Sequence, residues 1–181
     1  MCPQYVAQVD DQVIGIISER LGEQYKVDIN GSLPAFLSQF AFEGATKRNK
    51  PNLNVHDISL LSLNAWLTRL AFSQVGSLVY ARVSVANKDM EPELTCISPI
   101  YKKEWTTGQN LLGELSGGYC FDCSLALAQS LLKEDCHVMR LLSSLRFEVS
   151  IGQNGRVWVR SDSCQQTIFV ASAITQSELL P

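Results

Sequence analysis

The sequence predicts two units in succession: a small closed β barrel and then an α+β unit. Five short segments rich in apolar residues lie close together in the first half, separated by turn residues such as Asn30-Gly31-Ser32. A polar, mixed stretch at 98–110 follows, and after it strand and helix patterns alternate. A length of 181 residues is enough for two small domains.

The first half is expected to form the barrel. Closing five short strands into a barrel leaves no open sheet edge, which explains how so few residues could be stable. The expected strands cover residues 12–18, 24–30, 33–38, 76–87 and 92–98.

One stretch of the first half does not fit a barrel. Residues 56–75 carry leucines at helical spacing, and this stretch is much longer than a usual connection between strands. It predicts either an amphipathic helix that packs across the barrel or a segment foreign to the domain.

The second half is expected to run strand, helix, strand, strand, helix. The pattern predicts a strand at 119–124, a helix at 125–145 with a break near Lys133–Asp135, and a final helix at 163–180. Between the helices lies a hairpin. This order is typical of a compact unit with helices on one face of a small sheet.

The hairpin loop, Gly152-Gln153-Asn154-Gly155, allows two interpretations. Asn154-Gly155 predicts a two-residue type I′ turn with positive φ at both positions, and apolar residues alternate on both sides. The two glycines would also let a phosphate approach the backbone closely. Local sequence favours the plain turn and leaves the phosphate-binding interpretation open.

Composition excludes several classes of protein. The net charge of −3 gives no global attraction to nucleic acid, so any binding would need a local patch. The candidate patch contains Lys47, Arg48 and Lys50. We see no signal peptide and no apolar run of membrane-spanning length, and we expect the six cysteines to stay reduced.

Metal and catalytic sites are not expected. Cys120 and Cys123 form a single CxxC without a second pair, which is a poor zinc site, so we expect no metal and no cofactor. With only two histidines, acid–base candidates are few. The enzyme alternative is a metal-dependent nuclease that uses Asp89 and Glu91.

Three long motifs resemble one known family. They are FEGATKRNKPN (42–52), VANKDMEPELTC (85–96) and GQNGRVWV (152–159). In this order they closely resemble the RNA exosome cap subunit family called exosome component 3, or ribosomal RNA-processing protein 40. The resemblance implies an S1-like OB barrel at 5–98 and a divergent KH domain at 99–176.

The resemblance also implies a function. Members of the family are non-catalytic and sit with related cap proteins on a ring of RNase PH-like subunits. There they help to guide single-stranded RNA into the 3′-to-5′ exonuclease complex, in ribosomal RNA processing and RNA decay. The implied partners are RNA and other exosome subunits, without a membrane, and the implied locations are nucleus, nucleolus and cytoplasm. The alternative is a pure protein-interaction scaffold without RNA contact.

Two departures from the family pattern concern the chain's extent. Family members usually begin with a further β-rich N-terminal domain that helps to hold them on the ring. This sequence lacks it, so we expect a fragment or shortened product. Residues 56–75 interrupt a join that is direct in the family, so they resemble an insertion.

The candidate RNA-binding residues are Lys47, Arg48 and Lys50, in a loop expected to project from the barrel. The competing interpretation is a solvated turn. Four aromatic residues could stack on bases, although each is more often part of a core: Tyr25, Phe36, Phe40 and Phe42. For the loop Gly152–Gly155 we favour a structural role, because an ordinary KH domain has its GxxG loop between two helices.

Overall fold

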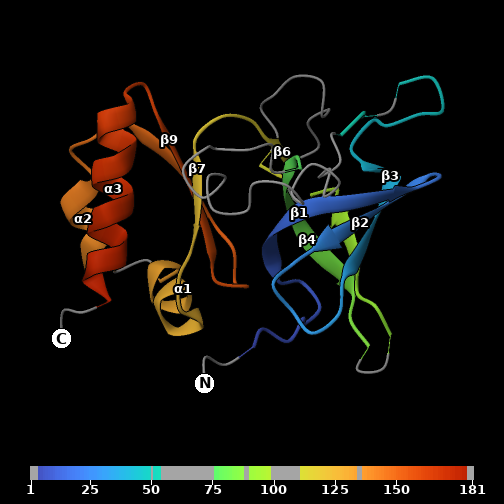
Figure 1. The fold of residues 1–181 in the computed structure, drawn as a ribbon, viewed down its shortest axis with the longest axis horizontal. Coiled ribbons are helices and arrows are strands. Elements are labelled where there is room, and N and C mark those ends of the chain that lie inside the picture. Colours follow the sequence, from blue (N-terminus) through green and yellow to red (C-terminus); the bar gives the residue numbers. More distant parts are fainter. Residues whose placement is uncertain are drawn as a thin grey trace, which may run out of the picture.

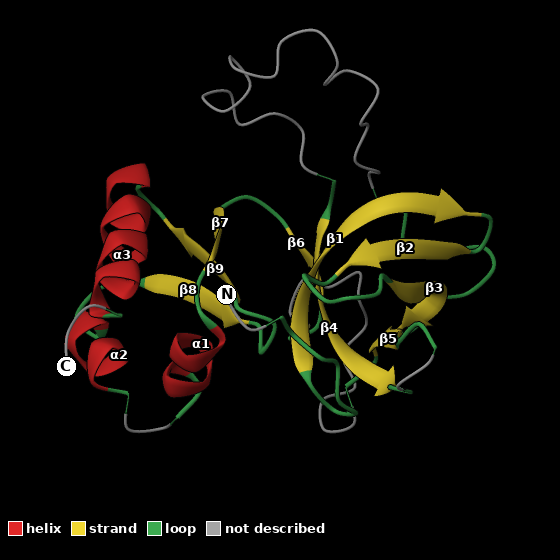
Figure 2. Ribbon diagram, turned by 60° about the horizontal axis from the view of Figure 1, so that its bottom comes forward, coloured by secondary structure: helices red, strands yellow, loops and turns green. Residues whose placement is uncertain are grey.

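The structure is a computed structural model that describes residues 4–49, 51–53, 76–87, 90–98, 111–133 and 136–178 (Figure 1). In both ribbon views a β barrel lies on one side of the molecule and a three-stranded sheet with helices lies on the other (Figure 2). The helix or insertion predicted at 56–75 lies outside the described residues, as does Lys50.

Five strands close into the barrel. β1 pairs with β2, β2 with β3, β3 with β5 and β5 with β4, and β4 returns to pair with β1. Only the β3–β5 pairing is parallel, and the predicted five-stranded closed barrel of the OB type is confirmed. The strands are β1 (Gln12–Leu21), β2 (Gln24–Asp28), β3 (Ala35–Phe42), β4 (Leu78–Val85) and β5 (Glu93–Cys96).

Alternating side chains fill the barrel. On β4, for example, Val79, Ala81 and Val83 are buried while the residues between them face outward. Tyr25 of β2 and Leu37 of β3 belong to the same core. Each fully buried large side chain contributes about 1.5–3 kcal/mol, so the barrel has a core of its own.

Strand β3 is longer than the sequence predicted, because it continues from Ser38 to Phe42. The extra residues include Gln39, which points inward and is fully buried. Its Nε2 donates to the carbonyl oxygen of Gly22 at 3.2 Å. A polar residue on the inward face interrupted the apolar alternation and hid the second half of the strand.

A short strand, β6 (Gly113–Leu115), follows the barrel and pairs with β4. It lies in the stretch predicted to belong to the second unit, yet its hydrogen bonds go to the barrel sheet. The domain bounds 5–98 and 99–176 stay a prediction.

The second unit has the predicted α+β order. Its strands pair antiparallel in the order β7-β9-β8, and its core lies between this sheet and the helices. Its elements are β7 (Tyr119–Asp122), α1 (Leu125–Leu131), α2 (His137–Leu142), β8 (Phe147–Ile151), β9 (Arg156–Ser161) and α3 (Cys164–Ser177).

The predicted break between the first two helices is confirmed. Ser124 caps α1, since its Oγ accepts the N–H of Leu127 at 3.1 Å. The helix ends at Leu131 and α2 begins at His137. Among the described helices, none combines the length and apolar character that a membrane crossing needs.

Candidate nucleic-acid interface

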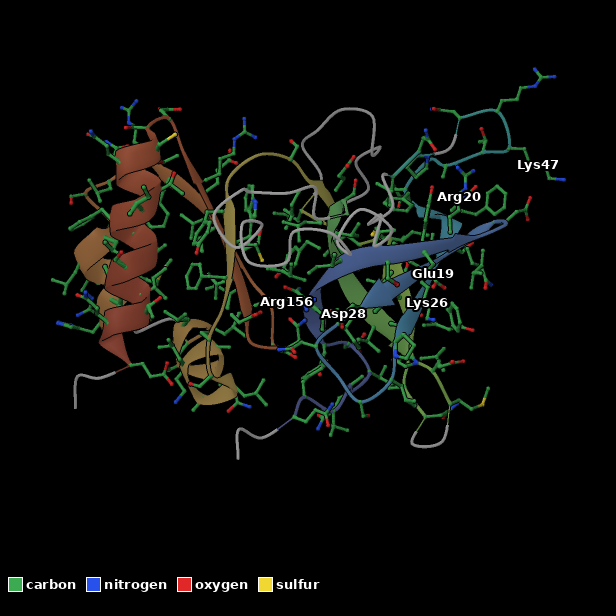
Figure 3. All side chains as sticks on the ribbon, viewed as in Figure 1. Glu19, Arg20, Lys26, Asp28, Lys47 and Arg156 are labelled. Atoms are coloured by element: carbon green, nitrogen blue, oxygen red, sulfur yellow. The ribbon has the colours of Figure 1, made fainter. Side chains whose placement is uncertain are left out.

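The basic loop forms a hydrogen-bonded turn at one end of the barrel. The N–H of Thr46 donates to the carbonyl oxygen of Asn49 at 2.9 Å, and the N–H of Asn49 donates back at 3.1 Å. Lys47 and Arg48 lie between these two residues, and both are exposed. Figure 3 shows Lys47 pointing away from the barrel.

The two cations of this turn have no ion-pair partner in the described part of the chain. Among the described residues, no carboxylate oxygen lies within ion-pair distance of Lys47 or Arg48. A phosphate could therefore bind them without first displacing a competing anion. The turn is held by its own backbone, so its side chains are presented from a fixed base.

The chain beyond the turn is fastened to the barrel by Tyr25. The hydroxyl of Tyr25 donates to the carbonyl oxygen of Pro51 at 3.1 Å and accepts the N–H of Leu53 at 3.3 Å. The ring itself has no exposed area. Tyr25 is thus a core residue that positions the loop, and it cannot stack on a base.

The other candidate aromatic residues divide in the same way. Phe42 is 3% exposed and belongs to the core, whereas Phe36 and Phe40 are half-buried on the outer face of β3. Phe36 lies opposite Lys26 in the β2–β3 register. Among the four, Phe36 has the best position for stacking, because its ring is only half-buried and borders an open groove.

Phe36 also lines a groove on the barrel wall. Between the pairs Leu37–Leu94 and Phe42–Cys96 the register of β3 and β5 shifts. The groove is open, with an apolar floor and hydroxyl groups around it. Its lining residues are Gln24, Phe36, Ser38, Ala41, Arg82, Ser84, Glu93, Leu94, Thr95 and Ile97.

The loop Gly152–Gly155 does join two strands, β8 and β9, but the predicted two-residue type I′ turn is wrong. The N–H of Gly155 donates to the carbonyl oxygen of Gly152 at 3.1 Å, and the N–H of Gly152 donates to that of Arg156 at 2.8 Å. Gly155 has φ +79°, whereas Asn154 does not belong to the described non-glycine residues with positive φ. This is the pattern of a three-residue loop with a glycine bulge.

Asn154 has a different task, which the sequence did not reveal. It has no exposed area, and its side-chain amide meets the barrel. Its Oδ1 accepts the N–H of Ile14 at 3.2 Å, and its Nδ2 donates to the carbonyl oxygens of Ile14 and Ile29, both at 2.8 Å. The amide thus pairs with the backbone of β1 as a neighbouring strand would.

Both glycines of the loop are required by close contact, and Gly155 is required by its positive φ as well. A Cβ on Gly152 would lie 2.9 Å from the backbone nitrogen of Ile14, and one on Gly155 would lie 2.7 Å from the carbonyl oxygen of Cys123. Both distances are too short for a real carbon atom. The loop therefore fits closely between the barrel and β7.

Arg156 forms a second connection beside Asn154. One of its terminal nitrogens donates to the backbone oxygen of Asp28 at 2.6 Å, and the other donates to the Asp28 carboxylate at 2.7 Å. Its Nε also lies 3.4 Å from the Asp122 carboxylate. Sequence reasoning missed this cluster, whose only signal was a cation next to an apolar strand.

The contact with Arg156 affects the pKa of the Asp28 carboxyl. Partial burial alone would raise the pKa of the Asp28 carboxyl, but the hydrogen bond from Arg156, the N–H of Asn30 and the Arg156 charge together hold it below its ordinary value. The pair is therefore charged at neutral pH and joins β2 to β9.

Other candidate sites offer less. Among the described residues no three potential metal ligands gather. Burial raises the pKa of Cys120 and of Cys123 to about 11, so both are poor thiolate ligands. Of the carboxylates considered for a nuclease, Asp89 lies outside the described residues and Glu91 is exposed in a connection.

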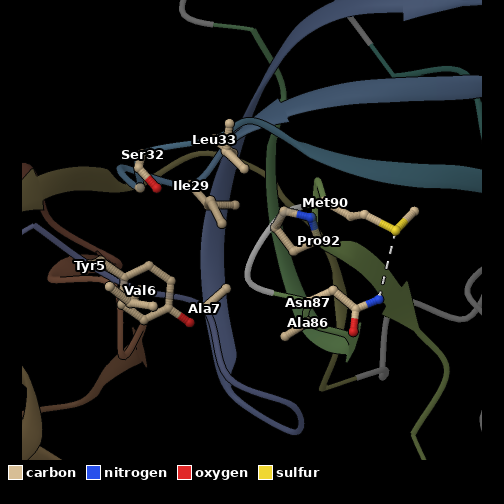
Figure 4. A pocket seen from close by; sticks show the side chains of 11 residues that line it. Tyr5, Val6, Ala7, Ile29, Ser32, Leu33, Ala86, Asn87, Met90 and Pro92 are labelled. Atoms are coloured by element: carbon tan, nitrogen blue, oxygen red, sulfur yellow. Dashed lines mark hydrogen bonds between the residues drawn. The ribbon is translucent and has the colours of Figure 1, made fainter.

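A small apolar hollow lies at the opposite end of the barrel from the basic turn (Figure 4). It has a volume of about 190 Å³ and lies between Tyr5, Leu33 and Met90. Asn87, at its margin, donates to the sulfur of Met90 at 3.9 Å. Among the described residues that line it none carries a charge, so they offer no contact to the phosphates of a nucleic acid.

Comparison with known protein families gives two matches. The model described as the S1 domain of exosome complex component RRP40 matches residues 5–66 and 68–108, and a KH-domain model matches residues 118–165. The break at position 67 lies within 56–75, the segment whose status as an insertion stays a prediction.

Several curated proteins are similar over nearly the whole chain. Exosome complex component RRP40 of Homo sapiens is 38% identical over 97% of this chain and 55% of its own length. The rrp40 component of Schizosaccharomyces pombe is 38% identical over 98% of this chain and 64% of its own length. The chain thus spans between about half and two-thirds of these relatives.

A solved structure described as an exosome complex RNA-binding protein has a similar fold. The TM-score is 0.64, with 22% sequence identity over 96% of this chain and 87% of that chain. At this identity the likeness supports the two-unit fold.

Proposed function

This chain belongs to the RRP40 family of exosome complex components, and from that premise we propose that it is a non-catalytic, RNA-binding cap subunit of the RNA exosome. In this role it helps to guide single-stranded RNA into the 3′-to-5′ exonuclease complex for ribosomal RNA processing and RNA decay. Its partners are RNA, the RNase PH-like ring and the related cap proteins. It acts in nucleus, nucleolus and cytoplasm.

The observation that carries the proposal is the basic turn. Lys47 and Arg48 are exposed, unpaired among the described residues, and fixed at the end of an OB-type barrel. With a net charge of −3, the chain as a whole repels RNA, so a local cationic group must supply the attraction. Lys50 follows directly in the sequence and adds a third positive charge.

Phe36 and the groove beside it supply the second element of a single-strand site. Phosphate contacts give affinity without sequence preference, and stacking on an aromatic side chain tolerates every base. A subunit that guides many different RNAs needs this combination. The hydroxyl groups of the groove are already engaged with the backbone, for example Ser84 with the carbonyl oxygen of Glu93 at 3.0 Å. They add little base discrimination.

The loop Gly152–Gly155 has a structural role in this proposal. A phosphate clamp needs free backbone N–H groups, and three of them are occupied: those of Gly152, Gln153 and Gly155 donate to the backbone oxygens of Arg156, Gln12 and Gly152. The amide of Asn154 is used by the barrel. The loop holds the second unit against the barrel, and the proposed RNA contact is made by the basic turn instead.

The proposal is tested by changing Lys47 and Arg48 together to alanine and measuring binding of fluorescent oligouridine RNA at several salt concentrations. The affinity at about 50 mM salt exceeds that at about 200 mM salt, and the loss of two phosphate contacts should reduce the ratio of these two affinities by a factor of about 7. An unchanged salt dependence would remove this turn from the RNA path.

Crosslinking in the assembled complex separates the RNA guide from a pure scaffold. We expect ultraviolet crosslinks between RNA and the barrel of the intact chain, and their loss in the double variant. A chain that assembles with exosome subunits but never crosslinks to RNA would be a scaffold. RNA cleavage by the purified chain, lost on changing Glu91, would contradict the non-catalytic role.

A further inference from the structure

Arg20 lies at the end of β1, close to the segment that follows the basic turn. It is exposed and stands opposite Tyr25 in the β1–β2 register. Its guanidinium carbon lies 5.9 Å from the centre of the Tyr25 ring, and its Nη1 donates to Oδ1 of Asn52 at 3.0 Å. Figure 3 shows Arg20 and Lys47 at the same end of the barrel.

The guanidinium of Arg20 is held in place before any ligand arrives. Tyr25 is buried and its hydroxyl is bonded on both sides of Asn52, to Pro51 and Leu53. The ring below Arg20 and the amide beside it are therefore parts of one fixed assembly. Ordering a long side chain in advance lowers the entropy lost when it binds.

No described carboxylate neutralises the charge of Arg20. Its partner Asn52 is uncharged, and among the described residues no carboxylate lies within ion-pair distance. The neighbouring cation on β2 differs, because Lys26 pairs with Glu19 at 3.5 Å. Arg20 thus combines a fixed position, exposure and an unpaired charge.

We propose that Arg20 is a phosphate-binding residue for single-stranded RNA, continuous with Lys47 and Arg48 along one basic rim of the barrel. This inference rests on the function proposed above. A guanidinium presents a planar fork of donors that matches two oxygens of one phosphate, and Asn52 uses only one nitrogen of that fork. The remaining donors can receive a phosphodiester.

The test compares Arg20→Gln with Lys133→Gln. Lys133 is exposed beyond the end of α1 in the second unit, so its change removes the same charge away from the rim. Binding of fluorescent oligouridine RNA is measured between about 50 and 200 mM salt. We expect Arg20→Gln to narrow the affinity difference over this range by a factor of about 2.5, with no change for Lys133→Gln.

Two further variants separate position from charge. Arg20→Lys keeps the charge but loses the fork, so we expect weaker binding with the salt dependence largely retained. Asn52→Ala keeps the guanidinium but frees it, and we expect a smaller loss than for Arg20→Gln. Thermal melting of each variant shows that the barrel is intact.

Equal effects of Arg20→Gln and Lys133→Gln would overturn the inference, because only net charge would then matter. An effect of the Lys47/Arg48 double variant without any effect of Arg20→Gln would also overturn it, while leaving the proposed function in place. If neither Arg20→Gln nor the Lys47/Arg48 double variant changes RNA binding, the proposed function itself fails.

Discussion

The turn Thr46–Asn49 and the loop Gly152–Gly155 are both tight turns of the backbone, but the first exposes its side chains and the second buries one. The first places Lys47 and Arg48 in solvent, with no carboxylate partner among the described residues. In the second, Asn154 is completely buried, and its side-chain amide forms hydrogen bonds with the barrel backbone. The glycine pattern that resembles an RNA-binding motif is thus the buried member of the pair.

The difference teaches that a motif has to be judged by which of its hydrogen-bonding groups remain free. In an ordinary KH domain the glycines expose backbone donors to phosphates. Here the same spacing lets the backbone approach the barrel and Cys123. Substitutions in the buried loop should therefore affect folding, and those in the exposed turn should affect RNA binding.

The largest expected effect is that of Asn154→Asp. Aspartate has nearly the same shape but no N–H groups, so the carbonyl oxygen of Ile29 loses its donor and a charge is buried next to it. We expect the free energy of unfolding to fall by about 2–5 kcal/mol. Thermal or urea unfolding measures it.

Gln153→Glu is the control for Asn154→Asp, because it makes the same chemical change one residue away in a half-buried side chain. It should cost less than about 1 kcal/mol. Equal destabilisation by the two variants would contradict the role of the Asn154 amide.

A smaller loss is expected for Gly155→Ala. The new Cβ would require strained backbone at φ +79° and would meet the carbonyl oxygen of Cys123. We expect a loss of about 1–3 kcal/mol. Gly22→Ala is the matched control, since φ is +62° there but nothing lies within 4 Å of the added carbon. Similar losses in both variants would show that contact with the carbonyl oxygen of Cys123 is unimportant.

The Asp28–Arg156 pair should make stability depend on pH. Because the folded state lowers the pKa of Asp28, its contribution is present above the ordinary carboxyl pKa and disappears as pH falls through the lowered value. Asp28→Asn should therefore lower the melting temperature at pH 7 and make little difference in strong acid. The carboxylate is about half exposed, at 54%, so the effect is modest. A constant difference at every pH would contradict the ion pair.

The smallest effect on stability is expected for the double change of Lys47 and Arg48 to alanine. Neither side chain makes an ion pair among the described residues, and the turn is closed by backbone atoms. The free energy of unfolding should stay within about 0.5 kcal/mol of the original while RNA binding weakens. A large drop in melting temperature would show that the turn is structural as well.

Local patterns predicted most of the fold. Short apolar segments separated by turn residues marked the five barrel strands, and the break at Lys133–Asp135 was visible as a charged interruption between apolar runs. The pattern failed where a polar residue faced inward, as Gln39 does in β3. Because glutamine is polar, the sequence pattern there resembles the end of a strand, although the side-chain amide is buried and hydrogen-bonded.

The candidate site was only partly predictable. Exposure of Lys47 and Arg48 followed from a basic run that ends near a proline. The partners of Asn154 and Arg156 could not be predicted, because Ile14 and Asp28 are more than a hundred residues away along the chain. Arg20 was missed for a related reason, since its proposed role depends on a hydrogen bond to Asn52, which lies 32 positions away along the chain.

The Asn154 junction has a consequence for sequence drift. Its side chain binds only main-chain atoms of Ile14 and Ile29, and every amino acid except proline carries these same groups. A substitution at either of these two positions therefore leaves the hydrogen bonds of Asn154 intact, provided that the backbone geometry of the barrel is kept. Preserving this joint depends on one asparagine and two glycines. The side chains of Ile14 and Ile29 are buried, so packing in their surroundings, and not the joint, limits what can replace them.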